Sequence, residues 1–477
     1  PPHLREIKFG LNHSAWQPED IDRLSALLTK YSDRFSENPV DLRYCSTIPF
    51  RIELKPGTRP IKQRAYRRNP AIHAKLQVEI DKMVLAGISR RSNSEWASPV
   101  VCVMKKNGLV RVTANLKRLN SATVVPCSVL PHIAECINQL GGSSVFSVLD
   151  LVSGFYQAAI HEDSIPLTAI VTSTGLYEFV RVPMGASGAP NHFQLLMAKV
   201  CEGLERVQLY LDDIVVHSKS AAEHVVHFEK LLERLRIHNL KLAPKKANVG
   251  AAEVEFLGHL ITPSGLAPGC GKVAALENMP MPTNKSQLRS LLGSFSYLRK
   301  FIPNLATRVR GLNEMLKKGK EFRFMTRHEE TTKAILKTLM STTTLAFPDY
   351  EAAIDGSRPF QLSSDASVHG FGAAPEQQQS NGTTRPLAYV SRSTFPNERN
   401  WDTTDLEMGA LVWAVKKLRV YLYGIPFVVH TDHQPLTSYL SLSEKKPRVH
   451  RMCDFLSSYQ FSLRYKKGND NQVADML

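Results

Sequence analysis

Cysteines, long apolar runs and acidic residues are all scarce in this sequence. The seven cysteines among 477 residues form no C-x-x-C pair, which argues against a disulfide framework or a thiolate zinc site and favours reduced, intracellular thiols. No apolar run approaches 18 residues, so no transmembrane helix is expected, and the first residues do not resemble a signal peptide. Because the chain starts at Pro1 and stops at Leu477 just after an acidic residue, we expect both ends to be cuts from a longer chain.

The shortage of acidic residues leaves a strong positive balance. Lys and Arg number 60 against 44 Asp and Glu, which gives a formal charge of +16 and a pI near 9.5. This balance favours a polyanionic partner, nucleic acid first and a membrane surface second. A basic strip, Lys62, Arg64, Arg67 and Arg68, is predicted to contact a nucleic-acid backbone rather than to form an ordinary solvated face.

Two adjacent carboxylates interrupt an apolar stretch, VQLYLDDIVVHS, at Val207–Ser218. The β-branched and aromatic residues on both sides predict strand, turn, strand, with Asp212 and Asp213 at the turn. Two like charges in an apolar hairpin are costly unless a cation neutralises them, and Mg²⁺ prefers oxygen ligands. The alternative is an ordinary Asp-Asp turn at the surface.

A third carboxylate, Asp150, ends the predicted strand Val145–Leu149, 62 residues before Asp212. A single Asp in that place is more often a cap or turn residue. Three carboxylates on two neighbouring strands, however, can hold two Mg²⁺ ions about 3.5–4 Å apart, with Mn²⁺ as a possible substitute. One ion then activates an attacking hydroxyl and the other stabilises a leaving pyrophosphate, which is the chemistry of nucleotidyl transfer.

Seven motifs follow one another along the chain: WASPV, KKNG with the later RV and LN, VLDLVSGFYQ, VPMGASGAPNHFQ, YLDD, FLGHLITPSG and LRSLLGSFSYLRKFIPN. Together and in this order they resemble the motifs of reverse transcriptases, and most closely those of the gypsy class of LTR retrotransposons. The last resembles the thumb segment of that class, and the similarity runs from about Asp20 to the end. The resemblance implies a segment of a Pol polyprotein that lies between a protease and an integrase.

The resemblance also implies roles for residues of the polymerase site. Asp150 and Asp212 would bind metal most directly, and Asp213 would support them. Phe155 matches the steric gate that excludes a 2′-OH, with an ordinary core Phe as the alternative. The implied dNTP-binding residues are Lys106 and Arg111 (with Lys105 as an alternative to Lys106), Phe155 and Met184.

Contacts with nucleic acid are implied for three further groups of residues. They are Trp96, Ser98 and Pro99 on the template strand, Phe256, Leu257, Gly258 and His259 as the primer grip, and Arg289, Arg299 and Lys300 in the thumb segment.

Some positions depart from the family pattern. Residues 113–120 read TANLKRLN where CVDYRxLN is usual. Met184 stands where Phe or Gln is common, and Ala186 stands where Leu is common. Because the metal carboxylates are intact, we expect activity with altered nucleotide affinity and fidelity. The alternative is a catalytically impaired, element-derived protein that only binds nucleic acid.

A second acidic set occupies the C-terminal part of the chain. Asp365, Glu407, Asp432 and Asp475 follow one another at intervals of 42, 25 and 43 residues. Their order resembles the D-E-D-D set of RNase H domains, in which two metals hydrolyse the RNA strand of a hybrid. Two histidines flank Asp432, but the preference of Mg²⁺ for oxygen argues against imidazole ligands.

Two features weaken the expectation of RNase H activity. Pro375 interrupts GFGAAPEQ and is predicted to shorten that strand or to place it at a sheet edge. Asp475 lies so close to the end that its helix is expected to fray.

The expected fold is an α+β multidomain chain, a right-hand polymerase with fingers, palm and thumb followed by an α/β RNase H-like domain. Helices are predicted over 14–40, 71–86, 190–203, 222–236 and 403–419. The expected domains are 1–45 (N-terminal helical segment), 46–262 (fingers and palm), 263–335 (helical thumb), 336–359 (tether) and 360–477 (RNase H-like). The expected partners are an RNA template, a DNA primer, RNA–DNA hybrid and dNTPs, in the cytoplasm and, by family resemblance, in a virus-like particle.

Overall fold

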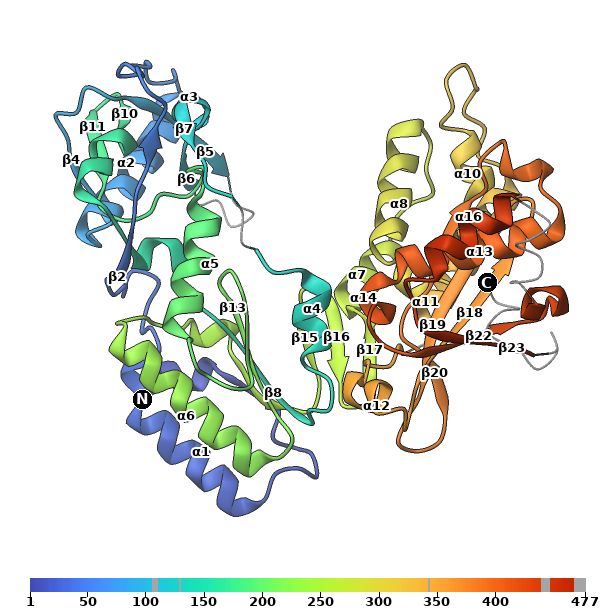
Figure 1. Cartoon of the computed structure of the whole chain (residues 1–477). Coiled ribbons are helices and arrows are strands. Elements are labelled where there is room, and N and C mark those ends of the chain that lie inside the picture. The colour runs from blue at the N-terminus through green and yellow to red at the C-terminus, as the bar shows by residue number, and fades with distance from the viewer. Residues whose placement is uncertain (105–109, 128–129, 342–343, 439–446, 467–477) are drawn as a thin grey trace. The chain divides into compact units, whose positions relative to one another are not determined.

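The computed structural model describes residues 1–104, 110–127, 130–341, 344–438 and 447–466. The chain divides into two compact units, Pro1–Val254 (unit 1) and Glu255–Leu477 (unit 2). Both mix helices with sheets (Figure 1), as the sequence predicts. Among the described residues, no helix combines the length and the apolar character needed to cross a bilayer.

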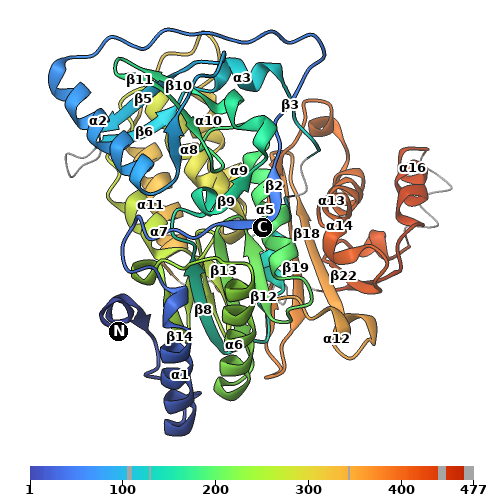
Figure 2. The ribbon, with the colours of Figure 1, turned by 90° about the vertical axis from the view of Figure 1, so that its left-hand side faces the viewer.

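The centre of unit 1 is a five-stranded sheet that holds the first acidic set. Its strands, in spatial order, are β1 (Lys8–Phe9), β14 (Asn248–Ala251), β8 (Val145–Asp150), β13 (Asp213–Ser218) and β12 (Val207–Tyr210). Helices α1 (Pro18–Lys30) and α6 (Ala221–Ile237) lie side by side next to it (Figures 1 and 2). The side chain of Ser220 caps α6, and its apolar residues at three- and four-residue spacing are buried, which confirms the predicted helix 222–236.

A second five-stranded sheet forms the other end of unit 1. Its strands, in spatial order, are β4 (Ser89–Arg91), β11 (Gly175–Phe179), β10 (Ile170–Thr172), β5 (Ser98–Met104) and β6 (Val110–Ala114). Helix α2 (Pro70–Leu85) packs on it. This helix confirms the prediction over 71–86; the Asn69 side chain caps it, and Gly87, at a φ of +64°, follows its end.

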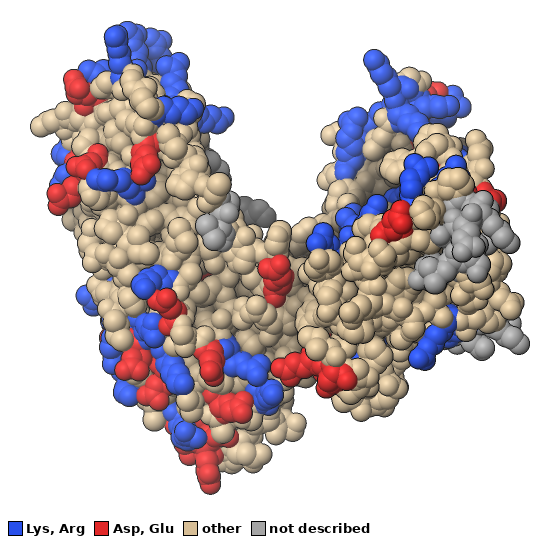
Figure 3. Space-filling view, in the orientation of Figure 1, with Lys and Arg blue, Asp and Glu red and all other residues tan. Residues whose placement is uncertain are grey.

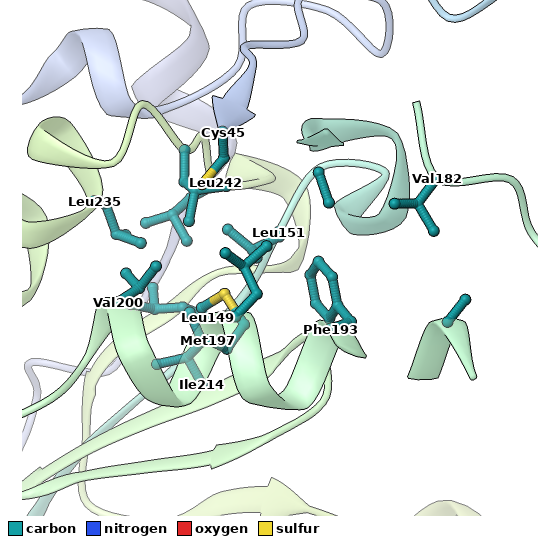
Figure 4. Packing of buried hydrophobic residues seen from close by; sticks show 14 of the residues in the cluster. Cys45, Leu149, Leu151, Val182, Phe193, Met197, Val200, Ile214, Leu235 and Leu242 are labelled. Atoms are coloured by element: carbon teal, nitrogen blue, oxygen red, sulfur yellow. The ribbon is translucent and has the colours of Figure 1, made fainter. Parts of the chain in front are cut away.

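Shorter elements connect these sheets. They are β2 (Cys45–Phe50), β3 (Glu53–Leu54), α3 (Lys117–Ala122), β7 (Thr123–Val124), α4 (Ile133–Asn138), β9 (Ala158–Ile160) and α5 (Ala189–Val200). Figure 4 shows Phe193, Met197 and Val200 of α5 among buried residues of β8, β13 and α6. This packing fixes α5 beside the strands that carry the carboxylates.

The predicted helix over 14–40 is wrong in length. Helix α1 stops at Lys30, and a single turn at Ser32–Arg34 follows. Beyond it the backbone is bound to another segment, because the Ser36 N–H donates to the Leu242 carbonyl and the Leu242 N–H donates to the Arg34 carbonyl. These long-range hydrogen bonds override the apolar periodicity.

A buried histidine cluster beneath the first sheet makes the stability of unit 1 dependent on pH. His224 Nε2 lies 2.7 Å from Ser147 Oγ, and burial lowers the pKa of His224 to about 3. The unfolded chain therefore takes up this proton below pH 6.5, whereas the folded chain does not until about pH 3. We expect unit 1 to lose roughly 2 kcal/mol of unfolding free energy between pH 7.5 and 5 from His224 alone. Urea unfolding at both pH values measures the loss.

The matched variant is His224→Gln, which lacks the titrating group. It should be less stable than the wild type at pH 7.5, because the contact with Ser147 is disturbed, but it should lose less stability on acidification. An equal loss in both proteins would contradict the assignment.

Unit 2 begins with a three-stranded meander and a group of helices. The elements are β15 (Val254–Phe256), β16 (His259–Thr262), β17 (Gly265–Pro268), α7 (Cys270–Glu277), α8 (Lys285–Tyr297), α9 (Leu305–Arg308), α10 (Arg310–Glu314), α11 (Thr326–Met340) and α12 (Tyr350–Ile354). Several contacts join these elements to the sheet that follows. The Ala306 N–H donates to Ser391 Oγ, and the Arg385 guanidinium donates to the carbonyls of Ser264 and Thr344.

The C-terminal sheet has the spatial order β20-β19-β18-β22-β23, with β21 also paired to β19. Its strands are β18 (Phe360–Ala366), β19 (Gly370–Gln378), β20 (Thr384–Pro386), β21 (Val390–Ser393), β22 (Phe427–Thr431) and β23 (Phe461–Tyr465). Its helices are α13 (Thr403–Lys417), α14 (Arg419–Leu422) and α16 (Pro447–Leu456). Helix α13 packs on β18 and β19 (Figure 1).

The predicted effect of Pro375 is wrong. Strand β19 continues through Pro375, which pairs with Leu362 of β18, and the strand lies inside the sheet. The Pro375 carbonyl accepts from the Leu387 N–H on the other side, so the proline nitrogen also points away from β18. On the side of β19 that faces away from β18, the partner strand changes from β21 to β20 near Pro375. The missing N–H of Pro375 therefore interrupts no row of interstrand hydrogen bonds.

Candidate active sites and nucleic-acid contacts

Antiparallel pairing of β8 and β13 brings the first acidic set together. Asp213 stands directly opposite Asp150, and Tyr210 of β12 stands opposite Asp213 on the other side. The turn is therefore Leu211-Asp212, one residue earlier than predicted, and Asp213 begins β13. Leu211 adopts a φ of +57°, and its N–H donates to Gln194 Oε1 at 2.7 Å. Gln194 on α5 thus holds the turn.

Burial and mutual repulsion disfavour ionisation of these carboxylates. Burial raises the pKa of Asp213 to about 6, and the charges of Asp212 and Asp150 add to the effect. The pKa of Asp150 is also raised by burial, with Asp212 adding and Lys246 opposing. Crowded carboxylates that resist ionisation gain most from a cation.

Lys246 is a site residue that sequence reasoning missed. Its Nζ lies 2.7 Å from Asp150 Oδ2, while the buried Asp150 Oδ1 has no hydrogen-bond partner. The only signal in the sequence is the basic pair after Pro244, and its partner stands 96 residues away.

A cavity of about 1,040 Å³ opens beside these carboxylates. It is lined by Asp150, Asp212 and Lys246, and also by Phe155 and Met184, so the structure gathers four of the predicted site residues. The Phe155 ring packs against Phe193 with centroids 5.0 Å apart. A Cβ on Gly154 would lie 2.9 Å from Phe193, so only glycine fits there.

The donor chemistry fits divalent cations, although the described side chains do not form a complete metal site. No group of three or more His, Cys, Asp or Glu among them has the arrangement of metal ligands. The unpartnered, buried oxygen of Asp150 and the raised pKa of Asp213 nevertheless show uncompensated acidity, which hard cations relieve with oxygen ligands. Asp150, Asp212 and Asp213 would hold such ions.

The second acidic set is built from β18, α13 and the end of β22. In the parallel pairing of β18 with β22, Ser363 stands opposite His430, so Asp365 and Asp432 follow at the same level. Glu407 is buried on the helix that covers this sheet, and burial together with the charges of Asp365 and Asp432 raises its pKa to about 8. The structure thus brings three of the four acids together, and Asp475 lies outside the described residues.

The residues expected on the template strand are not at the surface. Trp96 and Ser98 are 9% and 6% exposed, and Pro99 is buried as well. The Ser98 N–H donates to the Ala169 carbonyl, so this segment anchors β5. Exposed cations lie elsewhere in unit 1, and among them Lys62, Arg64 and Arg67 precede α2. Figure 3 shows Lys and Arg gathered over this end of unit 1.

The predicted primer-grip segment is a tight hairpin. Leu257 and Gly258 form the turn between β15 and β16 with φ values of +48° and +72°. Tyr297 Oη donates to the Leu257 carbonyl at 3.0 Å, and a Cβ on Gly258 would meet the Lys272 ammonium. The Phe256 and His259 side chains are buried, so the turn is what solvent reaches.

The three thumb cations differ in exposure. Arg289 on α8 is exposed, whereas the Arg299 guanidinium donates to the Ser391 carbonyl. Burial lowers the pKa of Lys300 to about 8. Lys105, Lys106 and the side chain of Arg111 lie outside the description, so their predicted role at the triphosphate stays a prediction.

Two family models match the chain. Residues 103–261 match "Reverse transcriptase (RNA-dependent DNA polymerase)", and residues 355–459 match "RNase H-like domain found in reverse transcriptase". Two structures of foamy viral protease-reverse transcriptase, one with dsDNA and one with an RNA/DNA hybrid, are similar in fold. They are 22% and 21% identical, with TM-scores of 0.85 and 0.80, and each match covers 98% of this chain and 97% and 63% of the viral chains.

Retroelement proteins are similar in sequence as well. The Pol polyprotein from transposon opus of Drosophila melanogaster is 35% identical over 498 residues, with 100% of this chain and 49% of the relative covered. That from transposon 297 of the same organism is 32% identical over 482 residues, with 98% and 44% covered. The chain therefore spans less than half the length of each. It belongs to the reverse transcriptase–RNase H family carried by the Pol polyproteins of gypsy-like LTR retrotransposons.

Proposed function

We propose that this chain is an RNA- and DNA-templated DNA polymerase with its own RNase H activity, and that each acidic set works with two divalent metal ions. The observation that carries the proposal is the register of β8 and β13, which sets Asp213 opposite Asp150, beside the turn that presents Asp212 to the cavity. That juxtaposition supports a site in which three carboxylates would act on a primer end and a dNTP.

Each residue of the polymerase site has a task that follows from its surroundings. Bound Mg²⁺ would supply the charge that activates a hydroxyl and stabilises a leaving pyrophosphate. Asp150 and Asp212 would hold it, and Gln194 keeps the turn in place through the Leu211 N–H. Lys246 forms an ion pair with Asp150 and would balance its charge when no cation is bound. The protein thus contributes position and charge rather than covalent chemistry.

The second acidic set would hydrolyse the RNA strand of a hybrid. Glu407 is flanked by Asp365 and Asp432, and its raised pKa supports the proposal, because a bound cation would favour the ionised form of all three carboxylates. Since Pro375 leaves β19 intact, the strand beside Asp365 is regular, and one argument for a catalytically impaired protein is removed.

The partners follow from charge and from the related structures. RNA template, DNA primer, RNA–DNA hybrid and dNTPs are the proposed ligands, and the cationic segment before α2 and the turn at Leu257-Gly258 are the proposed contacts. We place the chain between a protease and an integrase in a polyprotein, in a cytoplasmic virus-like particle.

One assay tests both proposed activities. A DNA primer on an RNA template with a labelled RNA strand should be extended, and the RNA should be cut, when Mg²⁺ or Mn²⁺ is added. Extension without added metal, or none at any metal concentration, would contradict the proposal.

Phe155 is expected to control the choice of sugar. Its ring lines the cavity with Asp150 and Asp212, where it would clash with a 2′-OH. Phe155→Val should raise the ratio of rNTP to dNTP incorporation by roughly 100-fold, measured by single-nucleotide extension. Phe9→Val, which changes an exposed ring on β1, is the matched control. An unchanged ratio in Phe155→Val would show that Phe155 is an ordinary core residue.

A further inference from the structure

A second cavity, of about 650 Å³, lies in the RNase H-like domain between α13, α16 and the segment from Arg392 to Trp401. On α13 it is lined by Gly409, Trp413 and Lys416, which stand on the side of the helix away from Glu407. Its size is within the range of small-ligand pockets. We call it the aromatic–cationic cavity, and neither proposed active site includes it.

The walls of the aromatic–cationic cavity are fixed by close contacts. A Cβ on Gly409 would lie 2.7 Å from the Trp401 ring, so the absence of a side chain lets the ring rest on α13. The Arg448 guanidinium covers that ring at 4.7 Å from its centroid. This segment is therefore held in place before any ligand arrives.

A layer of rings and a guanidinium forms the opposite wall. Arg392 donates two hydrogen bonds to Glu398, at 2.6 and 2.7 Å. Its guanidinium lies 4.8 Å from the Phe395 centroid and 5.6 Å from that of Trp413. Phe395 is 58% exposed, so a flat apolar face is presented to solvent beside this layer.

The lining of the aromatic–cationic cavity keeps a net positive charge, because two of its cations remain after two others are neutralised in ion pairs. Glu398 neutralises Arg392, and Asp405 neutralises Arg448. Lys416 and Arg451 line the cavity and are exposed, and within the described part of the chain neither has a carboxylate partner. Lys416 also lies 4.6 Å from the Phe455 centroid. Two cations and several rings thus remain for a ligand.

We propose that the aromatic–cationic cavity binds a single-stranded stretch of nucleic acid. Exposed rings and guanidinium planes stack on unpaired bases, and interleaved cations bind the phosphates between them. A base pair offers no free face to such a site, so duplex is excluded. The RNase H-like domain would then hold an unpaired strand separately from the hybrid at its acidic set.

A protein ligand fits the same surface less well. Aromatic and arginine residues also anchor protein interfaces, but the two unpaired cations and the chain's net charge of +16 favour a polyanion. The proposal does not depend on catalysis, because binding here needs neither acidic set.

The test is photocrosslinking with the whole chain. A 12-nucleotide oligouridylate that contains 4-thiouridine is irradiated with the protein in the presence of excess unlabelled RNA–DNA hybrid, which occupies the duplex-binding surfaces. Crosslinks, mapped by mass spectrometry, should fall on peptides that contain Phe395, Trp401 or Arg451. Phe395→Ala and Arg451→Ala should each reduce the yield at these peptides on the order of ten-fold. Lys417→Ala, an exposed cation next to the cavity but not in its lining, should leave it unchanged.

Three results would overturn the proposal. Crosslinks that fall only on unit 1 would place single-strand binding elsewhere. An unchanged yield in Phe395→Ala and Arg451→Ala would show that the crosslinks arise from random encounters. A change in sedimentation of Phe395→Ala without a change in crosslinking would show that the cavity binds protein, such as a second copy of this chain.

Discussion

Primer extension on an RNA template should fall by roughly 1,000-fold or more when Asp212 is replaced by Asn. The substitution keeps the size of the side chain but removes the negative charge from the turn that faces the cavity. Backbone support for this turn comes from Gln194, which the substitution does not touch, so the hairpin should keep its conformation. The measurement is the rate of single-dNTP incorporation at saturating Mg²⁺.

Two controls separate lost chemistry from lost folding. Asp163→Asn changes an exposed acid of the same unit, whose side chain is 73% accessible, and should extend primers at the wild-type rate. Cleavage of a labelled hybrid by Asp212→Asn should continue, because Glu407 and its neighbours belong to unit 2. Wild-type extension by Asp212→Asn would remove Asp212 from the polymerase site.

Glu407→Gln should reduce RNA-strand cleavage about as strongly as Asp212→Asn reduces primer extension. The loss of a carboxylate between Asp365 and Asp432 is expected to slow cleavage of the RNA strand by roughly 1,000-fold, while extension is unchanged. Because burial and these neighbours raise the pKa of Glu407 to about 8, its carboxyl is mostly protonated at pH 7 without metal. Neutral Gln should therefore leave the melting temperature in metal-free buffer unchanged or slightly higher.

Hydrolysis of a 5′-labelled RNA in a hybrid, followed over time, measures the expected loss. Glu351→Gln, at an exposed position on α12, should cleave normally. If Glu407→Gln also cleaved normally, the acids of unit 2 would be structural. If it unfolded at a lower temperature than wild type in metal-free buffer, Glu407 would have to be ionised in the folded chain.

Local pattern was sufficient for most elements and for the pairing of the first acids. Strand Val145–Leu149 and helix 222–236 were predictable because their local apolar patterns agree with the observed elements. The predicted turn of the acidic hairpin lies one residue after the observed turn. Asp is favoured in turns, whereas the structure puts Leu211 in the left-handed conformation. The conformation of Leu211 depends on its hydrogen bond to Gln194, seventeen residues away, and a prediction from neighbouring residues does not include that contact.

Long-range contacts explain the remaining differences. The hydrogen bonds of Ser36 and Leu242 end the first helix early, and the contact of Lys246 with Asp150 crosses 96 residues. The expectation that Pro375 shortens its strand or leaves it at an edge was wrong, because only the register of three strands shows on which side its missing N–H falls. The motif WASPV likewise does not predict that Trp96 and Ser98 are buried.

The joints between the helices of unit 2 and its C-terminal sheet have a mechanical consequence. The Ala306 N–H is bound to Ser391, and Arg385 clamps the carbonyls of Ser264 and Thr344. A force applied to the hairpin at Leu257-Gly258 by the duplex that we propose as a ligand would therefore be transmitted through β17 to the C-terminal sheet that holds the second acidic set. The helices and the C-terminal sheet of unit 2 would then respond to such a load as one body. A motion that advances a primer would also move the second acidic set.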